Sequence, residues 1–449
     1  MRPRIETLGV VLERQPKMPE DTDAELSRRA FLKTAGTSVA ALALAAEAAR
    51  SVNAAAPPVV PPPAPETKPI PLPPTSAATE RTPDPAPTPL APSRRLGIAV
   101  VGLGNLALAQ VIPAFGETKY CKLTALVSGT PDKAREVAGQ HGIPASSVYS
   151  YETYDTIKNN PDVDIIYLIL PNSMHAEYTV RGARAGKHIL CEKPMAISSA
   201  ECRQMIDACA KASRKLMIAY RIQYEPNNRY MRQLVQSQQY GPVKVIEAVN
   251  GQNQGDPSQW RQKKALAGGG SLPDVGLYCL NTTRFLTGEE PSEVTATIYS
   301  TPGDPRFAEV EETVLWQMAF PSGIRSNSAT SYGFHEDRRY RVHAATGWFG
   351  LDPAFSYHGL QPELSYATGK IEHRERPSLG DKNQFALEMD HMALCVMQDK
   401  TPYTPGEEGL QDQRIMEAIY QSAKTGKPVK LPLITTRDTF RGSPPADAG

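Results

Sequence analysis

The sequence predicts a fold of the α/β class that begins with a doubly wound parallel sheet. Residues 97–115, "GIAVVGLGNLALAQVIPAF", place a continuous apolar run before a glycine turn and helical apolar spacing after it. Two more continuous apolar runs, in "DVDIIYLILPNSMH" (residues 162–175) and "GKHILCEKP" (residues 186–194), end in polar clusters. Apolar runs without alternation are typical of strands that helices cover on both faces.

Length and composition limit the possible functions before any motif is considered. The chain has 449 residues, which is enough for two or three domains with sizeable cores. Lys and Arg total 49 and Asp and Glu total 48, so the formal net charge is +1. Since the neutralisation of phosphates needs a basic excess, we expect no nucleic-acid partner.

The cysteines form no pattern that is typical of a metal site or a disulfide framework. None stands in a CxxC pair or beside histidines at zinc-ligand spacing. We therefore expect no metal. We also expect buried, unpaired thiols at all six positions: Cys121, Cys191, Cys202, Cys209, Cys279 and Cys395.

Residues 1–55 are typical of a twin-arginine signal peptide. The segment "SRRAFLK" (residues 27–33) carries the arginine pair, and a mildly apolar, alanine-rich run follows it. This run is too short and too alanine-rich for a membrane-spanning helix, and an amphipathic surface helix would not explain the arginine pair. We expect export to the periplasm and no membrane contact beyond export. The cleavage site and the start codon, with Met18 as a second choice, stay open.

Residues 56–94 form a proline-rich segment, with 15 prolines among the 36 residues from Pro57 to Pro92. Fixed φ angles and missing backbone donors favour extended polyproline II over helix or sheet. Two interpretations stay open, a disordered spacer and an arm that lies across a neighbouring subunit. A stiff segment loses less entropy when it docks, which suits the second interpretation.

The turn after the first predicted strand has the pattern Gly102-x-Gly104-x-x-Ala107. Its glycines permit a tight turn and the close approach of a ligand, while the following helix offers its N-terminal amides to a pyrophosphate. The pattern alone is a weak signal, but it stands in the strand–turn–helix context that it requires. We therefore expect a dinucleotide to bind at Gly102, Gly104, Asn105, Leu106 and Ala107.

The second predicted strand, in "KLTALVSG" (residues 122–129), indicates which dinucleotide binds. NAD-binding units usually end this strand in Asp or Glu, which holds the ribose hydroxyls. Here Ser128 stands at the strand end, and Lys133 follows within about one helical turn. A hydroxyl and a cation suit a 2′-phosphate, so the sequence favours NADP over NAD. In the alternative interpretation, Lys133 is an ordinary solvated helix residue.

The polar clusters at the next two strand ends should line the same site, because ligands of open α/β sheets bind beyond the carboxyl ends of the strands. The first cluster runs from Pro171 to His175, and the second is Glu192-Lys193-Pro194. A lone histidine is more often structural than catalytic, so we expect His175 to line the site without a catalytic role. Lys193 stands between a carboxylate and a proline at a strand end, so we expect it to be positioned for function.

Asp274 and Tyr278 stand four residues apart in "LPDVGLYCLNTTRFL". If a helix begins there, both side chains project from one face. A phenol is a poor base near neutral pH unless a nearby cation stabilises its anion, and Lys193 could supply that cation across a cleft. In the alternative interpretation, Tyr278 is a core residue of an amphipathic helix.

The chain resembles the Gfo/Idh/MocA oxidoreductases over residues 94–430. The resemblance rests on "GLGNLALAQVIPAF", "LILPNSMHAEY", "CEKPMA", "YRIQYEPNNRY", "GDPSQWRQKKALAGGGSLPDVGLYCLNTTRFLTGEEP" and "TPGEEGLQD". It implies a Rossmann domain at residues 95–220 and an α+β domain at residues 221–435, with a C-terminal tail at residues 436–449. The second domain would hold a large, open, mostly antiparallel sheet that serves substrate binding and oligomerisation.

The resemblance also implies the residues of the site. Lys193 and Tyr278 match the catalytic lysine and tyrosine of the family, and Asp274 matches the supporting carboxylate; with Tyr224, these three match positions at the substrate. The positions that match cofactor contacts are Gly102, Gly104, Asn105, Leu106, Ala107, Ser128, Lys133, Tyr151, Leu170, Pro171, Asn172, His175, Glu192, Lys193, Arg221, Trp260 and Arg261.

The exported members that this chain resembles oxidise an aldose to its lactone and reduce a second sugar to an alditol. The resemblance therefore implies tightly bound NADP that is recycled in a ping-pong cycle with glucose-like and fructose-like substrates. It also implies a homotetramer, or a dimer, with arm exchange. Two alternatives stay open: an exported sugar dehydrogenase with exchangeable NAD(P), and a sensor that binds dinucleotide or sugar without turnover. The sequence does not name the sugar pair.

Overall fold

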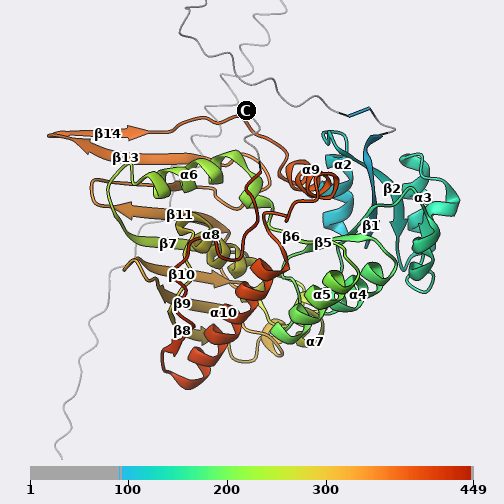
Figure 1. Cartoon of the computed structure of the whole chain (residues 1–449). Helices are drawn as coiled ribbons and strands as arrows, with labels where there is room; N and C mark the ends of the chain where they lie inside the picture. Colours follow the sequence, from blue (N-terminus) through green and yellow to red (C-terminus); the bar gives the residue numbers. More distant parts are fainter. Residues whose placement is uncertain (1–89, 92–93, 446–449) are drawn as a thin grey trace, which may run out of the picture. The chain divides into compact units, whose positions relative to one another are not determined.

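The computed structural model describes residues 90–91 and 94–445, and its elements are labelled in Figure 1. The predicted signal peptide and the proline-rich segment up to residue 89 lie outside the described residues. Within the described part, no helix is long and apolar enough to cross a membrane. The same residues contain no group of three or more His, Cys, Asp or Glu side chains that could hold a metal ion.

The first sheet has six strands, all parallel, in the order β3-β2-β1-β4-β5-β6. This is the doubly wound order of dinucleotide-binding domains, so the predicted fold of the first domain is confirmed. Residues 98–101 of the first strand are fully buried, as the continuous apolar run predicts. The strands are β1 (Leu96–Val101), β2 (Cys121–Val127), β3 (Val148–Tyr149), β4 (Ile165–Leu168), β5 (His188–Glu192) and β6 (Leu216–Ala219).

Short and long helices connect these strands. Labels with η denote 3₁₀- or π-helical segments; the helix after the glycine turn, for example, starts with a π turn. The helical segments of the first domain are η2 (Ala107–Val111), α2 (Ile112–Ala114), α3 (Pro131–Gln140), η3 (Ala145–Ser147), η4 (Tyr154–Asn159), η5 (Asn172–Met174), α4 (His175–Arg184) and α5 (Ser199–Lys211).

The second sheet has nine strands in the order β14-β13-β12-β11-β7-β10-β9-β8-β15. Only the β7–β10 pair is parallel, so the mostly antiparallel sheet that the resemblance implies is confirmed. The strands are β7 (Val243–Gly251), β8 (Glu293–Tyr299), β9 (Thr313–Ala319), β10 (Arg325–Ser331), β11 (Asp337–Ala344), β12 (Gly347–Leu351), β13 (Pro362–Thr368), β14 (Ile371–Glu375) and β15 (Val429–Lys430).

Helices cover one face of this second sheet, where α6, α8 and α10 lie in front of the strands in Figure 1. Alternation along the strands fits a sheet with one covered face: in β9, Val314 and Trp316 are buried while Leu315 between them is exposed. The helical segments of this domain are η6 (Arg221–Tyr224), α6 (Pro226–Ser237), η7 (Trp260–Gln262), α7 (Lys264–Ala267), η8 (Leu272–Gly276), α8 (Leu277–Thr287), η9 (Pro305–Phe307), α9 (Gln384–Met397) and α10 (Gly406–Thr425).

A buried ion cluster anchors the C-terminal segment, which the sequence predicted only as a tail. Arg441 donates to Glu408 Oε1 of α10 at 2.7 Å, and both side chains are fully buried. Arg284 of α8 donates to Glu408 Oε2 at 2.8 Å and to Glu290 Oε2 at 2.7 Å, and it also pairs with Asp412. The segment after β15 is therefore fastened to the helices of the second domain.

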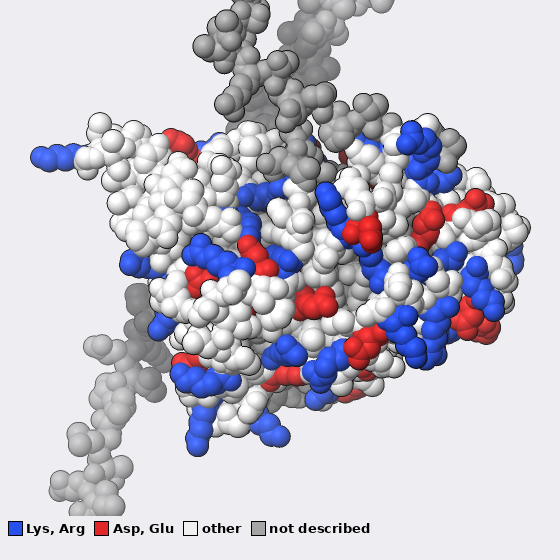
Figure 2. Space-filling view, in the orientation of Figure 1, with Lys and Arg blue, Asp and Glu red and all other residues white. Residues whose placement is uncertain are grey.

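The near-neutral charge of the chain is spread as a mixture of both signs over the face that Figure 2 shows. Lys and Arg side chains lie interspersed with Asp and Glu side chains there. Close pairs occur at the surface of the molecule, for example between Arg181 and Asp155 at 3.0 Å and between Arg181 and Glu177 at 2.9 Å. Exposed pairs of this kind add little stability, so the fold depends on its cores.

Candidate active site

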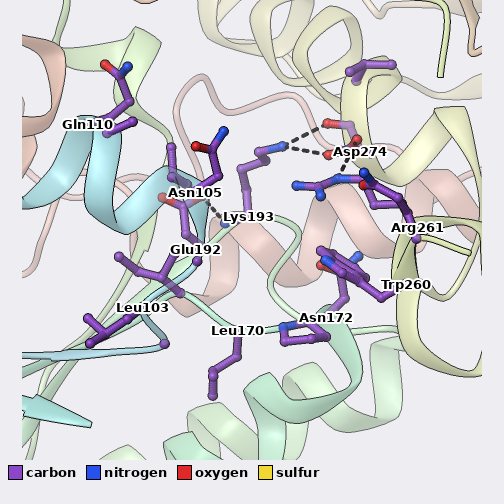
Figure 3. Close-up of a pocket in the computed structure, with 18 of the residues that line it drawn as sticks. Leu103, Asn105, Gln110, Leu170, Asn172, Glu192, Lys193, Trp260, Arg261 and Asp274 are labelled. Atoms are coloured by element: carbon purple, nitrogen blue, oxygen red, sulfur yellow. Dashed lines mark hydrogen bonds and ion pairs between the residues drawn. The ribbon is translucent and has the colours of Figure 1, made fainter. Parts of the chain in front are cut away.

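A cavity of about 810 Å³ lies at the carboxyl ends of the strands of the first sheet. The segments that follow β1, β2, β4, β5 and β6 meet residues of the second domain there. The predicted residues that line it are Gly102, Gly104, Asn105, Leu106, Ser128, Lys133, Tyr151, Leu170, Pro171, Asn172, Glu192, Lys193, Arg221, Trp260, Arg261, Asp274 and Tyr278, of which Figure 3 labels several.

The glycine turn leaves its backbone open to the cavity. Gly102 has φ of +96°, and a Cβ atom there would lie 2.2 Å from the carbonyl oxygen of Ile169. At Gly104, by contrast, a Cβ atom would meet nothing within 4 Å, so a ligand can approach this part of the turn closely. Ala107 does not line the cavity; it is fully buried, as close packing between helix and strand requires. The turn therefore fits a pyrophosphate.

Three predicted residues lie together at the β2 end of the cavity: Ser128, Lys133 and Tyr151. Ser128 directly follows β2, whose end carries no carboxylate. The ammonium group of Lys133 lies 3.4 Å from the carbonyl oxygen of Leu103 in the glycine turn, which keeps it at the cavity wall. A hydroxyl and a cation that line the same cavity, with no acid at the strand end, fit the 2′-phosphate of NADP.

A charged cluster lies at the other end of the cavity, where the two domains meet (Figure 3). Lys193 Nζ lies 2.8 Å from the backbone oxygen of Asp274 and 3.4 Å from its Oδ1. Arg261 Nε donates to Asp274 Oδ2 at 3.1 Å, and the Tyr332 hydroxyl donates to the same atom at 2.7 Å. The Lys193 ammonium also lies 4.8 Å from the ring centre of Tyr278.

The charges of this cluster hold its members ionised. Burial alone would raise the pKa of the Asp274 carboxyl, but Arg261, Lys193 and the hydrogen bond from Tyr332 hold that pKa well below its usual range. Burial would likewise lower the pKa of Lys193, but Tyr278, Asp274 and Glu192 hold it above its usual value. The cavity therefore keeps a fixed carboxylate and a fixed ammonium beside the phenol.

A second cation contacts the phenol oxygen itself. Arg221 Nε donates to Tyr278 Oη at 3.2 Å, whereas Lys193 lies over the ring. Arg221 is buried, and its guanidinium also donates to the backbone oxygen of Phe355 at 2.6 Å. Lys193 therefore lies beside the phenol as expected, and Arg221, predicted as a cofactor contact, adds a second cation at the phenol oxygen itself.

Family models match both domains. Residues 96–220 match the oxidoreductase family with NAD-binding Rossmann fold, and residues 228–350 match the GFO/IDH/MocA C-terminal domain. The chain belongs to the Gfo/Idh/MocA oxidoreductase family.

Several of the proteins that this chain is similar to are sugar oxidoreductases. D-xylose 1-dehydrogenase [NADP(+)] from Haloarcula marismortui is 30% identical over 346 residues, which are 74% of this chain and 92% of the relative. The crystal structure of aldose-aldose oxidoreductase from Caulobacter crescentus, complexed with glycerol, is 46% identical with a TM-score of 0.73, and the match covers 75% of this chain and 100% of that one. Levoglucosan dehydrogenase in complex with NADH and L-sorbose, at 20% identity and a TM-score of 0.67 over 76% of this chain and 100% of its own, supports the fold alone. The chain is therefore an NAD(P)-dependent oxidoreductase of a family that acts on sugars.

Besides Ala107, two residues that the family resemblance placed in the site lie elsewhere. His175 is fully buried and does not line the cavity; its ring nitrogens lie 2.9 Å from the backbone oxygen of Pro194 and 3.0 Å from that of Leu170. It supports the two strand-end loops from behind. Tyr224 lies at the far end of η6, where its hydroxyl is 2.8 Å from Thr404 Oγ1, and it lines a separate cavity of about 1110 Å³.

Several residues that line this cavity were not predicted from the sequence. Asn250, Gln252 and Gln254 line the cavity at and beyond the end of β7, and their every-second-residue spacing is a strand signal that was available. Tyr357 also lines it, with the Arg221 guanidinium 4.6 Å from its ring centre, but it comes from a loop without a local motif. Amide side chains suit a ligand with many hydroxyl groups.

Proposed function

We propose that this protein is an exported, NADP-dependent sugar oxidoreductase that resembles the periplasmic glucose–fructose oxidoreductases. It oxidises an aldose to its lactone and reduces a second sugar to an alditol with one tightly bound cofactor. The observation that carries the proposal is the cluster of Lys193, Asp274 and Tyr278 at the end of the cavity where the two domains meet. The similarity to an aldose-aldose oxidoreductase over the whole length of that relative supports it.

The cavity offers a complete set of groups for NADP. The glycine turn would bind the pyrophosphate, and Ser128 with Lys133 would bind the 2′-phosphate. Leu170, Pro171 and Asn172 would flank the reacting end. When bound, NADP supplies the acceptor and donor of hydride.

The residues of this chain would supply the proton chemistry. Tyr278 takes the proton of the sugar hydroxyl during oxidation and returns a proton during reduction. Arg221, at 3.2 Å from the phenol oxygen, and Lys193, over the ring, stabilise the phenolate. The ionised Asp274 accepts hydrogen bonds from sugar hydroxyls and so orients them.

Export explains why the cofactor should stay bound. A soluble nicotinamide cofactor is not regenerated outside the cytoplasm, so an exported enzyme must reoxidise its own with a second substrate. The twin-arginine route carries folded proteins, which lets the cofactor bind before export. We further propose that the protein is a homotetramer or dimer whose proline-rich arm, outside the described residues, covers the cofactor site of a neighbouring subunit.

The nucleotide that purifies with the protein tests this proposal. We expect denaturation of the purified holoenzyme to release NADP(H), because Ser128 and Lys133 stand where NAD-binding relatives carry an acid. Recovery of NAD alone would contradict the proposal. Release of free NADPH in a single turnover would favour the alternative of an exported dehydrogenase with exchangeable cofactor, and bound nucleotide without any turnover would favour a sensor.

A further inference from the structure

A buried carboxyl pair lies behind the cavity wall. The hydroxyl of Tyr167 on β4 lies 2.8 Å from Glu192 Oε1 at the end of β5 and 3.0 Å from Glu388 Oε1 on α9. Tyr167 and Glu388 are fully buried, whereas Glu192 is 7% exposed and lines the cavity, as Figure 3 shows. The Tyr167 hydroxyl therefore links a wholly enclosed acid to one that faces the ligand.

The hydrogen bonds of this cluster require an additional proton. A tyrosine hydroxyl has one proton to donate, and ionised carboxylates only accept. Both contacts of Tyr167 are hydrogen bonds if Glu388 is protonated and donates to the phenol oxygen while the phenol donates to Glu192. The other oxygen of Glu388, Oε2, has no hydrogen-bond partner among the described residues, which is far less costly for a neutral carboxyl than for a carboxylate.

The surroundings place the proton on Glu388 and the negative charge on Glu192. Burial raises the pKa of Glu388 well above its usual range, and the charge of Glu192 raises it further. Burial also raises the pKa of Glu192, but by less, because Lys193, the hydrogen bond from Tyr167 and Arg221 oppose that rise, so Glu192 is the more acidic of the two.

Two cations and two phenols face the pair from the elements packed around it. Lys193 follows Glu192 directly, and its backbone N–H donates to Glu192 Oε2 at 3.2 Å. The positive charge of Arg221 on η6 lowers the pKa of both acids. The phenols of Tyr224 and Tyr357 also face the pair, and burial raises the pKa of both, so they stay neutral. The charge on the pair is thus set by two cations and by whatever ligand occupies the cavity.

We propose that Glu192 and Glu388 form a proton store whose occupancy follows the redox state of the bound nicotinamide. This inference rests on the proposed function. The oxidised ring carries a positive charge and the reduced ring is neutral, so reduction removes a charge that favours ionisation of the pair. The pair therefore takes up a proton when the cofactor is reduced and gives it back when the cofactor is oxidised. Glu388, which does not line the cavity, is a positioning residue that acts through Glu192.

With this store, the protons and electrons of the two half-reactions balance. In the oxidation, the C–H bond of the aldose breaks and its electron pair leaves with the hydrogen as hydride to the nicotinamide. The O–H bond also breaks; Tyr278 takes its proton and passes it on, and the pair holds it instead of the solvent. In the reduction, hydride returns to the carbonyl carbon of the second sugar and the stored proton completes the new hydroxyl. The charge next to the cavity is then the same in both states.

Proton release in a single turnover tests the inference. A pH indicator in weak buffer reports the protons released when an aldose reduces the cofactor of the holoenzyme. Wild type should release fewer protons per reduced nicotinamide than Glu192→Gln, because Glu388 already holds its proton and the additional proton goes to Glu192, and the difference should approach one proton. Asp399→Asn, an exposed carboxyl beyond the end of α9, is the control and should match wild type. Equal release from wild type and Glu192→Gln at every pH would overturn the inference.

If Glu192→Gln does not fold or does not retain the cofactor, infrared difference spectroscopy on wild type tests the inference instead. On reduction of the bound cofactor, the band of a protonated carboxyl should gain intensity and shift in D₂O. The absence of any carboxyl change would overturn the inference while leaving the proposed function intact. If no sugar produces a reduced-nicotinamide band at all, the proposed function itself fails, and the inference fails with it.

Discussion

The phenol of Tyr278 is the residue on which the proposed chemistry depends most directly. Tyr278→Phe should still bind the cofactor, because most of the cavity wall is unchanged, but it should slow both half-reactions by roughly two to four orders of magnitude. Rapid mixing with detection of nicotinamide absorbance measures both rates. Tyr299→Phe, exposed on the second sheet, is the matched control. Rates of Tyr278→Phe close to those of wild type would contradict the assignment.

Asp274 should influence stability in a pH-dependent way. Burial opposes its charge, but Arg261 and Lys193 hold the pKa of Asp274 below its ordinary value of 3.8. A pKa that is lowered by folding stabilises the protein above the unfolded-state value, and this contribution is lost as the pH falls toward the folded-state value. Asp274→Asn should therefore reduce the free energy of unfolding by about 3 kcal/mol at neutral pH.

The reduction caused by Asp274→Asn should shrink progressively below about pH 4, where the unfolded-state carboxyl takes up its proton. Urea unfolding of both proteins at a series of pH values measures the difference. A difference that stays constant down to strongly acid pH would show that the ionised carboxylate is not what stabilises this site.

At the scale of single elements, the end of β2 controls the choice of cofactor. Ser128→Asp places a negative charge where the 2′-phosphate of NADP would bind, and like charges at an interface cost several kcal/mol. The ratio of NAD to NADP retained should therefore rise by about 100-fold or more. Mass spectrometry of the nucleotide released on denaturation measures the ratio, with Ser128→Ala as the control. Retention of NADP alone by Ser128→Asp would place the phosphate elsewhere.

The C-terminal segment should contribute strongly to the stability of the helical layer. Arg441→Met leaves Glu408 with one buried partner fewer, and breaking a buried pair typically costs about 3–5 kcal/mol. Arg437→Met is the matched control, since its side chain is half exposed and its pair with Glu289 should contribute less than about 1 kcal/mol. Thermal unfolding compares the variants, and equal losses in both would contradict the role of the cluster.

Element by element, the sequence predicted what depends on local pattern. Continuous apolar runs indicated the strands of the first sheet, and the polar ends of those runs indicated Lys193 and the loop that follows Leu170. The position of β7 between β10 and β11 could not be predicted, because such pairing depends on packing between segments far apart in the chain. The ion pair that holds the C-terminal segment through Arg441 could not be predicted for the same reason.

At the residue scale within the site, spacing fixed which residues are near but not where their side chains point. Arg221 and Tyr224 begin and end one short helix, yet one reaches Tyr278 and the other reaches Thr404. His175 follows a strand-end loop, as ligand-contacting residues do, but packing turns it toward backbone oxygens. Such directions depend on tertiary packing, which spacing along the chain does not show.

At the scale of the whole molecule, both domains are needed to build the cavity. The first domain supplies the glycine turn, Ser128 and Lys193, and the second supplies Asp274 and Tyr278. The ion pair between Lys193 and Asp274 joins the two halves at the site where chemistry would occur. Each domain on its own would lack some of the residues that take part in the reaction. The activity therefore requires both domains together.

The nicotinamide absorbance of the purified protein, recorded without added cofactor, tests the recycling of a bound cofactor most directly. We predict that the band of the reduced ring appears when glucose is added, stays with the protein through gel filtration, and disappears when fructose is then added. A band that appears only after NADP is supplied, or that leaves the protein in the small-molecule fraction, would contradict the proposal that one retained cofactor serves both half-reactions.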